Sequence, residues 1–238
     1  MFATAIVVAA GKGKRFNSKV PKPLVKIGGK PIVIHSLDAL NRHSAIREII
    51  VVANPLNVRA IIAEIKQYGL KKIICVTLGG NRRQDSVYNG LKLIHPQTDL
   101  VLVHDAARPF IDKNIISASL KAAVSSGAAV VGVPVKATIK KVKSKKEKGK
   151  SKLLVEKTID RDSLWEIQTP QAFKASLLLE AHRKSGSCEV TDDAMLIEKA
   201  GGKVVIVPGS YHNIKITTQE DLVIAKAILK SKKVKAKR

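Results

Sequence analysis

Glycines and cations follow the first apolar run of the chain, and their spacing suits the binding of a polyphosphate. Residues 5–10 are typical of a buried strand, which ends at a turn containing Gly11 and Gly13. Arg15 follows this turn, and Lys22 lies between two prolines shortly afterwards. Glycine lets backbone N–H groups approach phosphate oxygens, and the cations offset the phosphate charge. The alternative is a tight turn with solvated cations, because the segment matches neither standard glycine-rich phosphate motif.

A second glycine-rich segment, residues 79–86, follows the third strand-like run of the chain. Gly79 and Gly80 would allow a flat base to lie against the backbone, and Asn81 and Ser86 could hydrogen-bond its edge. The same segment also suits the start of a helix, with Asn81 as the N-cap and Asp85 in the first turn. The two interpretations are compatible, and the first predicts a nucleotide site.

A third segment, residues 101–109, carries a histidine, an aspartate and an arginine at the end of a strand-like run. Asp105 is a natural Mg²⁺ ligand at this position, and the ion would neutralise charge on nucleotide phosphates. Arg108 offers a planar fork for a second phosphate. A structural ion pair between Asp105 and Arg108 is the alternative. We interpret His104 as a packed or hydrogen-bonded residue and not as a general base.

Three later features have both a structural and a functional interpretation. Trp165, the single tryptophan, is interpreted as a core anchor. Thr191 or Asp192 suits a helix cap, although the acidic pair Asp192 and Asp193 could instead lie near a metal. Lys215 stands between two isoleucines near the last strand-like run, so it could point inward to a phosphate.

These candidates mostly follow strand ends, so their use as a site depends on the order of the elements. Strand-like runs occur at 3–9, 48–53, 72–77, 100–104, 128–133 and 203–207, and helix-like stretches occur at 31–42, 56–67, 83–94, 112–125, 174–184, 191–200 and 218–230. This alternation predicts an α/β fold with a doubly wound, mostly parallel sheet. Ligands of such sheets bind at the carboxyl ends of the strands, beside the switch in strand order.

Residues 134–161 break this alternation, and their polar–apolar pattern predicts a β-hairpin arm that projects from the sheet. So polar an arm cannot form a core of its own, and a second subunit is the simplest partner surface. The lysine-rich stretch 140–152 and the basic tail 230–238 carry about half of the formal net charge of +24. Such runs are usually solvated, or they bind nucleic acid non-specifically. The lack of interleaved aromatic residues disfavours a dedicated single-strand binder.

The composition is typical of one folded domain spanning residues 1–238. Hydrophobic residues make up 45% of the sequence, and no apolar run has the length of a membrane helix. The first apolar run lacks the basic flank of a signal peptide. Cys75, in a strand-like run, is expected in the core, and neither it nor Cys188 belongs to a disulfide framework or metal motif. We therefore expect a cytoplasmic protein.

The motifs occur in a fixed order from residue 9 to residue 217: AAGKGKRF, PKPL, GGNRRQDSV, HDAARPF, RDSLWEIQTPQAF, EVTDDA and NIKIT. Together they resemble the 2-C-methyl-D-erythritol 4-phosphate cytidylyltransferases of the non-mevalonate isoprenoid pathway. The resemblance implies a Rossmann-like nucleotidyltransferase fold and a homodimer joined by its arms. It also implies transfer of a cytidylyl group from CTP to methylerythritol phosphate, with release of pyrophosphate.

The resemblance assigns roles to residues at matching positions. The phosphates would be stabilised by Arg15, Lys22 and Lys215. The methylerythritol phosphate would be held by Asp105, Arg108, Thr191 and, from the arm of a second subunit, Thr138 and Arg161. CTP would be held by Ala9, Ala10, Gly11, Gly13, Gly80, Asn81 and Ser86. Asp105 would also lie near Mg²⁺ or another divalent cation.

Three departures from the family pattern and three rival functions remain. Pro23 replaces a frequent glutamine, Asn81 replaces a frequent acidic residue, and the lysines of 140–152 are unusual for the family. A ribitol 5-phosphate cytidylyltransferase is the nearest rival, since it shares the fold and a similar HDA-type motif. A nucleotidyltransferase acting on a sugar is the second. A basic nucleic-acid binding protein is a rival from another class.

Overall fold

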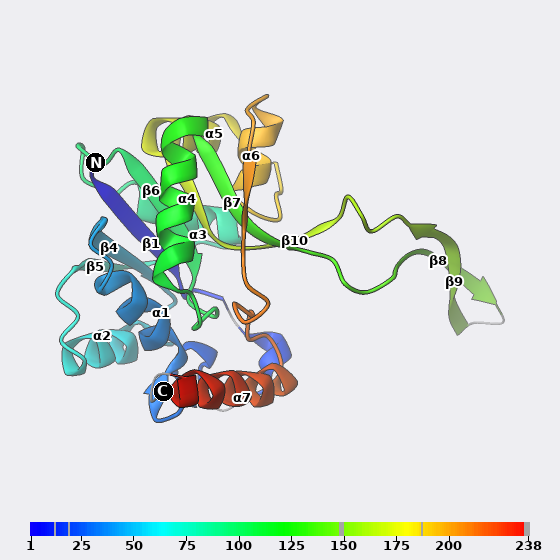
Figure 1. The fold of residues 1–238 in the computed structure, drawn as a ribbon, viewed down its shortest axis with the longest axis horizontal. Helices are drawn as coiled ribbons and strands as arrows, with labels where there is room; N and C mark the ends of the chain where they lie inside the picture. The colour runs from blue at the N-terminus through cyan, green and yellow to red at the C-terminus, as the bar shows by residue number, and fades with distance from the viewer. Residues whose placement is uncertain (12, 19, 148–149, 187, 236–238) are drawn as a thin grey trace.

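The computed structural model describes residues 1–238 except 12, 19, 148–149, 187 and 236–238. Its centre is a seven-stranded sheet of order β5–β4–β1–β6–β10–β7–β11 (Figure 1). The strands are β1 (Ala3–Val8), β4 (Ile46–Ala53), β5 (Ile73–Leu78), β6 (Leu100–Asp105), β7 (Ala128–Pro134), β10 (Trp165–Lys174) and β11 (Val205–Pro208). All neighbours are parallel except β10, which is antiparallel to β6 and β7. The predicted mostly parallel, doubly wound sheet is confirmed.

Helices cover both faces of this sheet because the central strands are apolar on both sides. Alternate residues of β1 point to opposite faces, so that Ala5 and Val7 belong to one buried cluster and Ile6 to the other. The first cluster contains residues of α1 (Ile32–Asn41), α2 (Val58–Gln67) and α4 (Lys113–Ser126). The second contains residues of α3 (Arg83–Leu91), α5 (Ala175–Lys184) and α6 (Ala194–Lys199). The sheet therefore holds the ends of β1 and β6 firmly between two layers.

A third apolar cluster fixes the loops beyond the carboxyl end of β1. It joins α7 (Gln219–Lys235) to Phe16, Ile27 and Phe110. Phe16 belongs to the short helix η1 (Lys14–Phe16), which is followed by η2 (Lys22–Leu24), β2 (Lys26–Ile27) and β3 (Lys30–Pro31). Figure 1 shows α7 running beside this N-terminal region, so the C-terminal helix supports the segment that carries Lys22.

The predicted hairpin arm is present and projects far from the body (Figure 1). It consists of β8 (Ile139–Glu147) and β9 (Lys150–Ile159), which form a separate two-stranded antiparallel sheet. Residues 148–149 of the lysine-rich stretch and 236–238 of the basic tail lie outside the described residues.

The strand β10 was not predicted. Its middle residues Gln168, Thr169 and Gln171 are polar, so the sequence lacks the alternation of a strand, and the pairing with β7 is irregular between Gln168 and Gln171. All three side chains are nevertheless buried, since each finds hydrogen-bond partners inside the protein.

Three structural interpretations of single residues are corrected. Trp165 does not anchor the core, because it begins β10 at the base of the arm and is 37% exposed. Cys75 is only half-buried, because β5 is the edge strand of the sheet. Asn81 is not the N-cap of α3: Arg82 occupies that position, and its backbone N–H donates to the Asp85 carboxylate at 3.0 Å.

Candidate active site

A cleft of about 360 Å³ opens at the carboxyl ends of β1 and β6. The strand β1 has β4 on one side and β6 on the other, so the cleft lies beside the switch in strand order. Several segments that are distant in the sequence meet there. The cleft is lined by Val8, Ala9, Ala10, Gly11, Lys22, Pro23, Ile32, Gly80, Asn81, Arg82, Arg83, Ser86, Asp105, Ala106, Ala107 and Lys215.

The backbone of the first phosphate loop is held in place by two asparagines. Asn57 Nδ2 donates to the Ala9 carbonyl at 3.1 Å, and Asn54 Nδ2 donates to the Ala10 carbonyl at 3.2 Å. A Cβ atom at Gly11 would meet no atom within 4 Å, so this glycine leaves open room for a ligand. Gly13 has φ +62°, which only glycine adopts readily, and lies just outside the lining of the cleft.

The second glycine loop is packed tightly against the helix that follows it. A Cβ atom at Gly79 would lie 2.5 Å from the Ala10 Cβ and 2.6 Å from Ser86 Oγ, so only glycine fits there. Gly80 N–H donates to Ser86 Oγ at 3.1 Å, and this hydroxyl donates to the Arg82 carbonyl at 3.1 Å. Ser86 therefore shapes the loop as well as lining the cleft.

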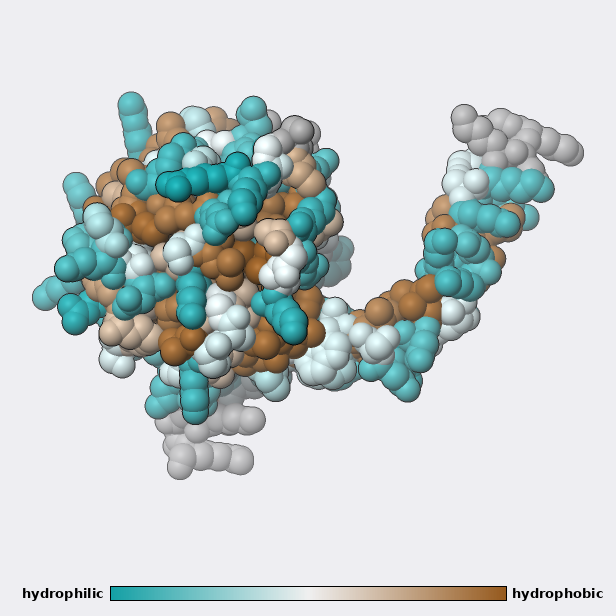
Figure 2. All heavy atoms as spheres, turned by 90° about the horizontal axis from the view of Figure 1, so that it is seen from above, coloured by the Kyte–Doolittle hydropathy of each residue, from teal (hydrophilic) through white to brown (hydrophobic). Residues whose placement is uncertain are grey.

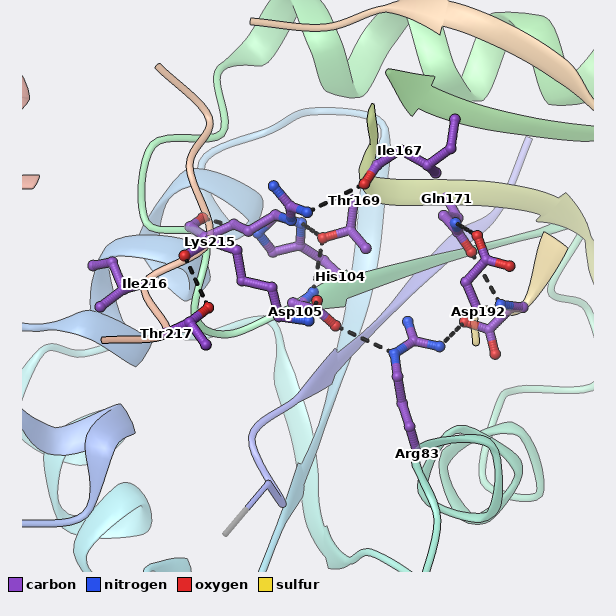
Figure 3. Close-up of polar contacts among 12 residues, drawn as sticks. Arg83, His104, Asp105, Ile167, Thr169, Gln171, Asp192, Lys215, Ile216 and Thr217 are labelled. Atoms are coloured by element: carbon purple, nitrogen blue, oxygen red, sulfur yellow. Dashed lines mark hydrogen bonds and ion pairs between the residues drawn. The ribbon is translucent and has the colours of Figure 1, made fainter. Parts of the chain in front are cut away.

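Asp105 is the one carboxylate among the described residues that line the cleft, and two cations approach it. Lys215 Nζ lies 2.6 Å from Asp105 Oδ2, and Arg83 Nε lies 3.4 Å from Asp105 Oδ1 (Figure 3). Burial opposes ionisation of Asp105, but Arg83 and Lys215 outweigh it and hold its pKa well below the usual range. The predicted pair between Asp105 and Arg108 is thus replaced by pairs with Lys215 and Arg83.

Lys22 enters the same cleft from η2. Its Nζ donates to the Ile216 carbonyl at 3.0 Å, beside Lys215. Burial lowers the pKa of Lys22, and the charge of Lys215 lowers it further. An anion bound between the two ammonium groups would relieve this repulsion. Arg15 is exposed on η1, and its charge also lowers the pKa of Lys22.

His104 is buried and hydrogen-bonded, as expected. Its Nε2 lies 3.1 Å from the Arg108 carbonyl, and its Nδ1 lies 3.1 Å from Thr169 Oγ1, which accepts from the Asp105 N–H. Burial lowers the pKa of His104 to about 4, so it is neutral at pH 7. Arg108 itself donates to the Asn213 carbonyl at 2.8 Å, which directs it to the loop before α7.

The remaining predicted residues do not line the cleft of this chain. Thr138 and Arg161 lie exposed at the base of the arm, where Arg161 donates to the Lys136 carbonyl at 2.7 Å. Thr191 is exposed before α6. The N-cap position of this helix is Asp193 and not Thr191 or Asp192, although Asp192 Oδ1 accepts from the Met195 N–H at 3.0 Å. Asp193, the second member of the acidic pair, is ion-paired with Arg83 at 2.7 Å.

The sequence reasoning gave no role to Arg83, Asn54 or Asn57. Arg83 stands at the start of a predicted helix. Its charge does not indicate a role there until its partners, Asp105 at the end of β6 and Asp193 before α6, are known. The two asparagines follow the strand now labelled β4, at the same end as the glycine loop after β1, and that placement could have indicated them.

The described side chains of the cleft would hold a magnesium ion only if a bound substrate supplied further oxygen atoms. Among the residues that the structure describes, no group of three or more histidine, cysteine, aspartate or glutamate side chains could hold a metal. Magnesium commonly uses one or two carboxylates together with substrate phosphates, and Asp105 supplies one such carboxylate. In the described part of the chain, none of the helices has both the length and the apolar character to cross a membrane.

Comparisons with known proteins match this chain over nearly its full length. The family model for 2-C-methyl-D-erythritol 4-phosphate cytidylyltransferase matches residues 3–231. The enzyme of that name from Alkaliphilus metalliredigens is 46% identical over 97% of this chain and 94% of its own length. The one from Geobacillus kaustophilus is 43% identical over 96% of this chain and 97% of its own length.

A solved structure is also similar over nearly the whole of this chain. The 4-diphosphocytidyl-2C-methyl-D-erythritol synthase from Anaerococcus prevotii is 34% identical, has a TM-score of 0.82, and overlaps 96% of each chain. A nucleic-acid binding protein and a ribitol 5-phosphate enzyme are therefore not favoured. The fold, the cleft and these likenesses agree, and the chain belongs to the 2-C-methyl-D-erythritol 4-phosphate cytidylyltransferase family.

Proposed function

We propose that this chain transfers the cytidylyl group of CTP to 2-C-methyl-D-erythritol 4-phosphate, giving 4-diphosphocytidyl-2-C-methyl-D-erythritol and pyrophosphate. The observation that carries the proposal is the convergence of Lys22, Lys215 and Arg83 with Asp105, the one carboxylate among the described residues that line the cleft, in a chain that the family model matches over residues 3–231. An oxygen of the acceptor phosphate attacks the α-phosphorus of CTP. The bond from that phosphorus to the bridging oxygen breaks, and pyrophosphate leaves with the electron pair.

This reaction needs alignment and charge neutralisation more than a base. The attacking phosphate is already an anion at neutral pH, and two anions must be brought together. Lys22 and Lys215, both in the cleft, are proposed to stabilise the charge that develops on the α-phosphate, together with Arg15, whose charge already acts on Lys22. The pKa of Lys22 is lowered by burial and by neighbouring cations, and an anion bound beside its ammonium group would offset both effects.

The nucleotide is proposed to occupy the two glycine loops. The cleft is lined by Ala9, Ala10 and Gly11 of the first loop and by Gly80, Asn81 and Ser86 of the second. Asn81 can both donate and accept, so it can read the edge of cytosine although the family often has an acidic residue there. Gly13, with its φ of +62°, is proposed to shape the loop that holds the nucleotide.

Asp105 is proposed to bind the acceptor and to hold Mg²⁺ together with the nucleotide phosphates. Bound Mg²⁺, or another divalent cation, would supply neutralisation of phosphate charge. The ion pairs of Asp105 with Lys215 and Arg83 keep its carboxylate ionised and available for these roles. Arg108 and Thr191 are proposed as further acceptor contacts.

A homodimer would complete the site through the arm, with Thr138 and Arg161 of a second subunit reaching the acceptor. The register supports a docking arm, because its two faces differ. Val142 pairs with Val155 and Ser144 with Leu153, while the alternate pairs contain lysines. Val155 and Leu153 are 61% and 71% exposed, and Figure 2 shows such apolar residues along the arm beside hydrophilic ones. The free thiols of Cys75 and Cys188 suit the cytoplasm proposed for this enzyme.

Pyrophosphate release by the purified chain tests the proposal. The protein is incubated with CTP, Mg²⁺ and either methylerythritol 4-phosphate or ribitol 5-phosphate. Release with the first acceptor alone is expected. Release with ribitol 5-phosphate alone would keep the reaction class but assign a different acceptor, and silence of the folded protein with both would refute the proposal.

A further inference from the structure

Arg83 connects the cleft to a buried carboxylate behind it. One side of its guanidinium faces Asp105, with Nε 3.4 Å from Oδ1, and the other faces Asp193, with Nη1 2.7 Å from Oδ2. Figure 3 shows Arg83 reaching from α3 between Asp105 and the carboxylates that precede α6. These three residues are called the Arg83 bridge below.

Asp193 is a costly residue to keep charged at this position. It is 0% exposed, and its Oδ1 has no hydrogen-bond donor among the described residues, with His182 Nε2 lying 3.6 Å away. Burial opposes its ionisation, but Arg83, together with the nearby His182, outweighs burial and lowers the pKa of Asp193. Burial likewise disfavours the charge on Arg83, and Asp193 and Asp105 raise its pKa above the usual value. The pair is therefore charged, and each member depends on the other.

The backbone at Asp193 and just before it is fixed to β10 and α3. Asp193 N–H donates to Gln171 Oε1 on β10 at 3.2 Å. Gln84 on α3 donates to the Cys188 carbonyl at 2.8 Å and accepts from Val190 N–H at 3.2 Å. Asp193 is thus a fixed anchor for Arg83, whereas the carboxylate of its neighbour Asp192 accepts from Gln171 Nε2 and from the Met195 N–H.

Asp105 is shared between two cations, and only one of them is anchored in this way. Lys215 lies on a loop, with a side chain that is 41% exposed, and Arg83 lies on a helix with its second carboxylate partner behind it. We propose that Asp193 is a positioning residue that acts through Arg83 to fix the direction of the Asp105 carboxylate toward the acceptor. The effect on the acceptor rests on the proposed function, whereas the bridge itself does not.

The bridge is tested first by stability, without any substrate. Thermal melting is measured for Asp193→Asn, Arg83→Gln, the double variant and the wild type. Removing one buried partner should lower the melting temperature by roughly 6 °C or more, because the other charge stays buried. Removing both charges should restore part of this loss, so the double variant melts above Asp193→Asn. A double variant that melts at or below Asp193→Asn would overturn the bridge.

The positioning role is tested by kinetics. In Asp193→Asn the KM for the acceptor should rise roughly tenfold or more, because a binding residue loses the partner that holds it in place. The Kd for CTP, measured by calorimetry, should stay within about threefold of the wild-type value. A purely structural defect lowers the folded fraction and hence apparent kcat, but it leaves KM unchanged. The double variant should be no worse than Arg83→Gln, since Asp193 acts through Arg83.

Asp192→Asn is the matched control, because it removes a neighbouring charge without touching Arg83, and it should keep the wild-type acceptor KM. If Asp193→Asn does not fold, Arg83→Lys takes its place, since lysine keeps the charge but lacks the fork that spans two carboxylates. An unchanged acceptor KM in Asp193→Asn or Arg83→Lys, or additive effects in the double variant, would overturn the positioning role. A wild type without turnover would refute the proposed function, and the melting comparison would still decide the bridge.

Discussion

Single residues of the cleft differ in how far the sequence revealed them. The chemistry of Lys22, Lys215 and Asp105 was predicted because each follows a strand end or a glycine loop, and the structure brings all three into one cleft. Arg83 was not predicted, because its importance comes from two partners distant in the sequence. The prediction that Trp165 anchors the core was wrong, because its position at the base of the arm depends on the fold and leaves it without a core to pack into.

Lys22 provides the first prediction at this scale. In Lys22→Ala, kcat should fall by roughly two to three orders of magnitude, as when a charge-stabilising donor is removed, while the KM for CTP changes by less than about threefold. The reason is that Lys22 is proposed to act on charge that develops at the α-phosphate. Steady-state kinetics measure both constants. Lys26→Ala is the control, since Lys26 is exposed on β2. A rise in the KM for CTP as large as the fall in kcat would contradict this role of Lys22.

His104 provides the second prediction, on the pH dependence of stability. Burial lowers its pKa from 6.5 to about 4, so between these values the unfolded chain binds a proton that the folded chain does not. Stability should therefore fall as the pH falls through this window, by about 2 kcal/mol between pH 7 and pH 5 from His104 alone. Burial also lowers the pKa values of His35 and His43, which act in the same direction.

Urea unfolding at the two pH values measures this change. His104→Gln should show a smaller loss between pH 7 and pH 5, because one titrating group is gone. A wild type that is equally stable at both values, or more stable at pH 5, would show that His104 is not held neutral.

Elements of regular structure were predicted more completely than single residues. The apolar runs of β1 and β6 and the amphipathic stretches of α1 to α5 carry clear periodicity, and their bounds agree with the structure to within a few residues. The strand β10 was not predicted because its buried polar residues hold residues near the site. Thr169 hydrogen-bonds to Asp105 and His104, and Gln171 hydrogen-bonds to Asp192 and Asp193. Polar residues paired in this way remove the pattern on which strand prediction depends.

The arm provides the prediction at the element scale. A short glycine–serine turn in place of residues 139–159 should leave the melting temperature nearly unchanged, because β8 and β9 pair only with each other among the described strands. The shortened chain should be monomeric by light scattering, bind CTP, and lose most turnover with the acceptor. Lys143→Gln with Lys145→Gln is the control, since it leaves the exposed apolar residues Val142, Leu153 and Val155 in place. A shortened chain that stays dimeric and fully active would contradict the role of the arm.

The whole molecule carries a formal net charge of +24, which should affect its binding to nucleic acid. Duplex DNA should bind weakly through phosphate contacts, with affinity falling at least roughly tenfold from low to physiological salt. Fluorescence anisotropy with two unrelated sequences measures this, and both should behave alike. Tight binding of one sequence at physiological salt would instead point to a nucleic-acid function that the cleft does not explain.

The central claim, attack of the acceptor phosphate on the α-phosphorus, is tested most directly by an isotope measurement. Methylerythritol 4-phosphate labelled with oxygen-18 in its phosphate is converted with unlabelled CTP, and the products are analysed by phosphorus NMR. The account predicts label in the diphosphate of the cytidine product, including its bridging oxygen, and none in pyrophosphate. Label in a released phosphate species, or CDP as the nucleotide product, would contradict it.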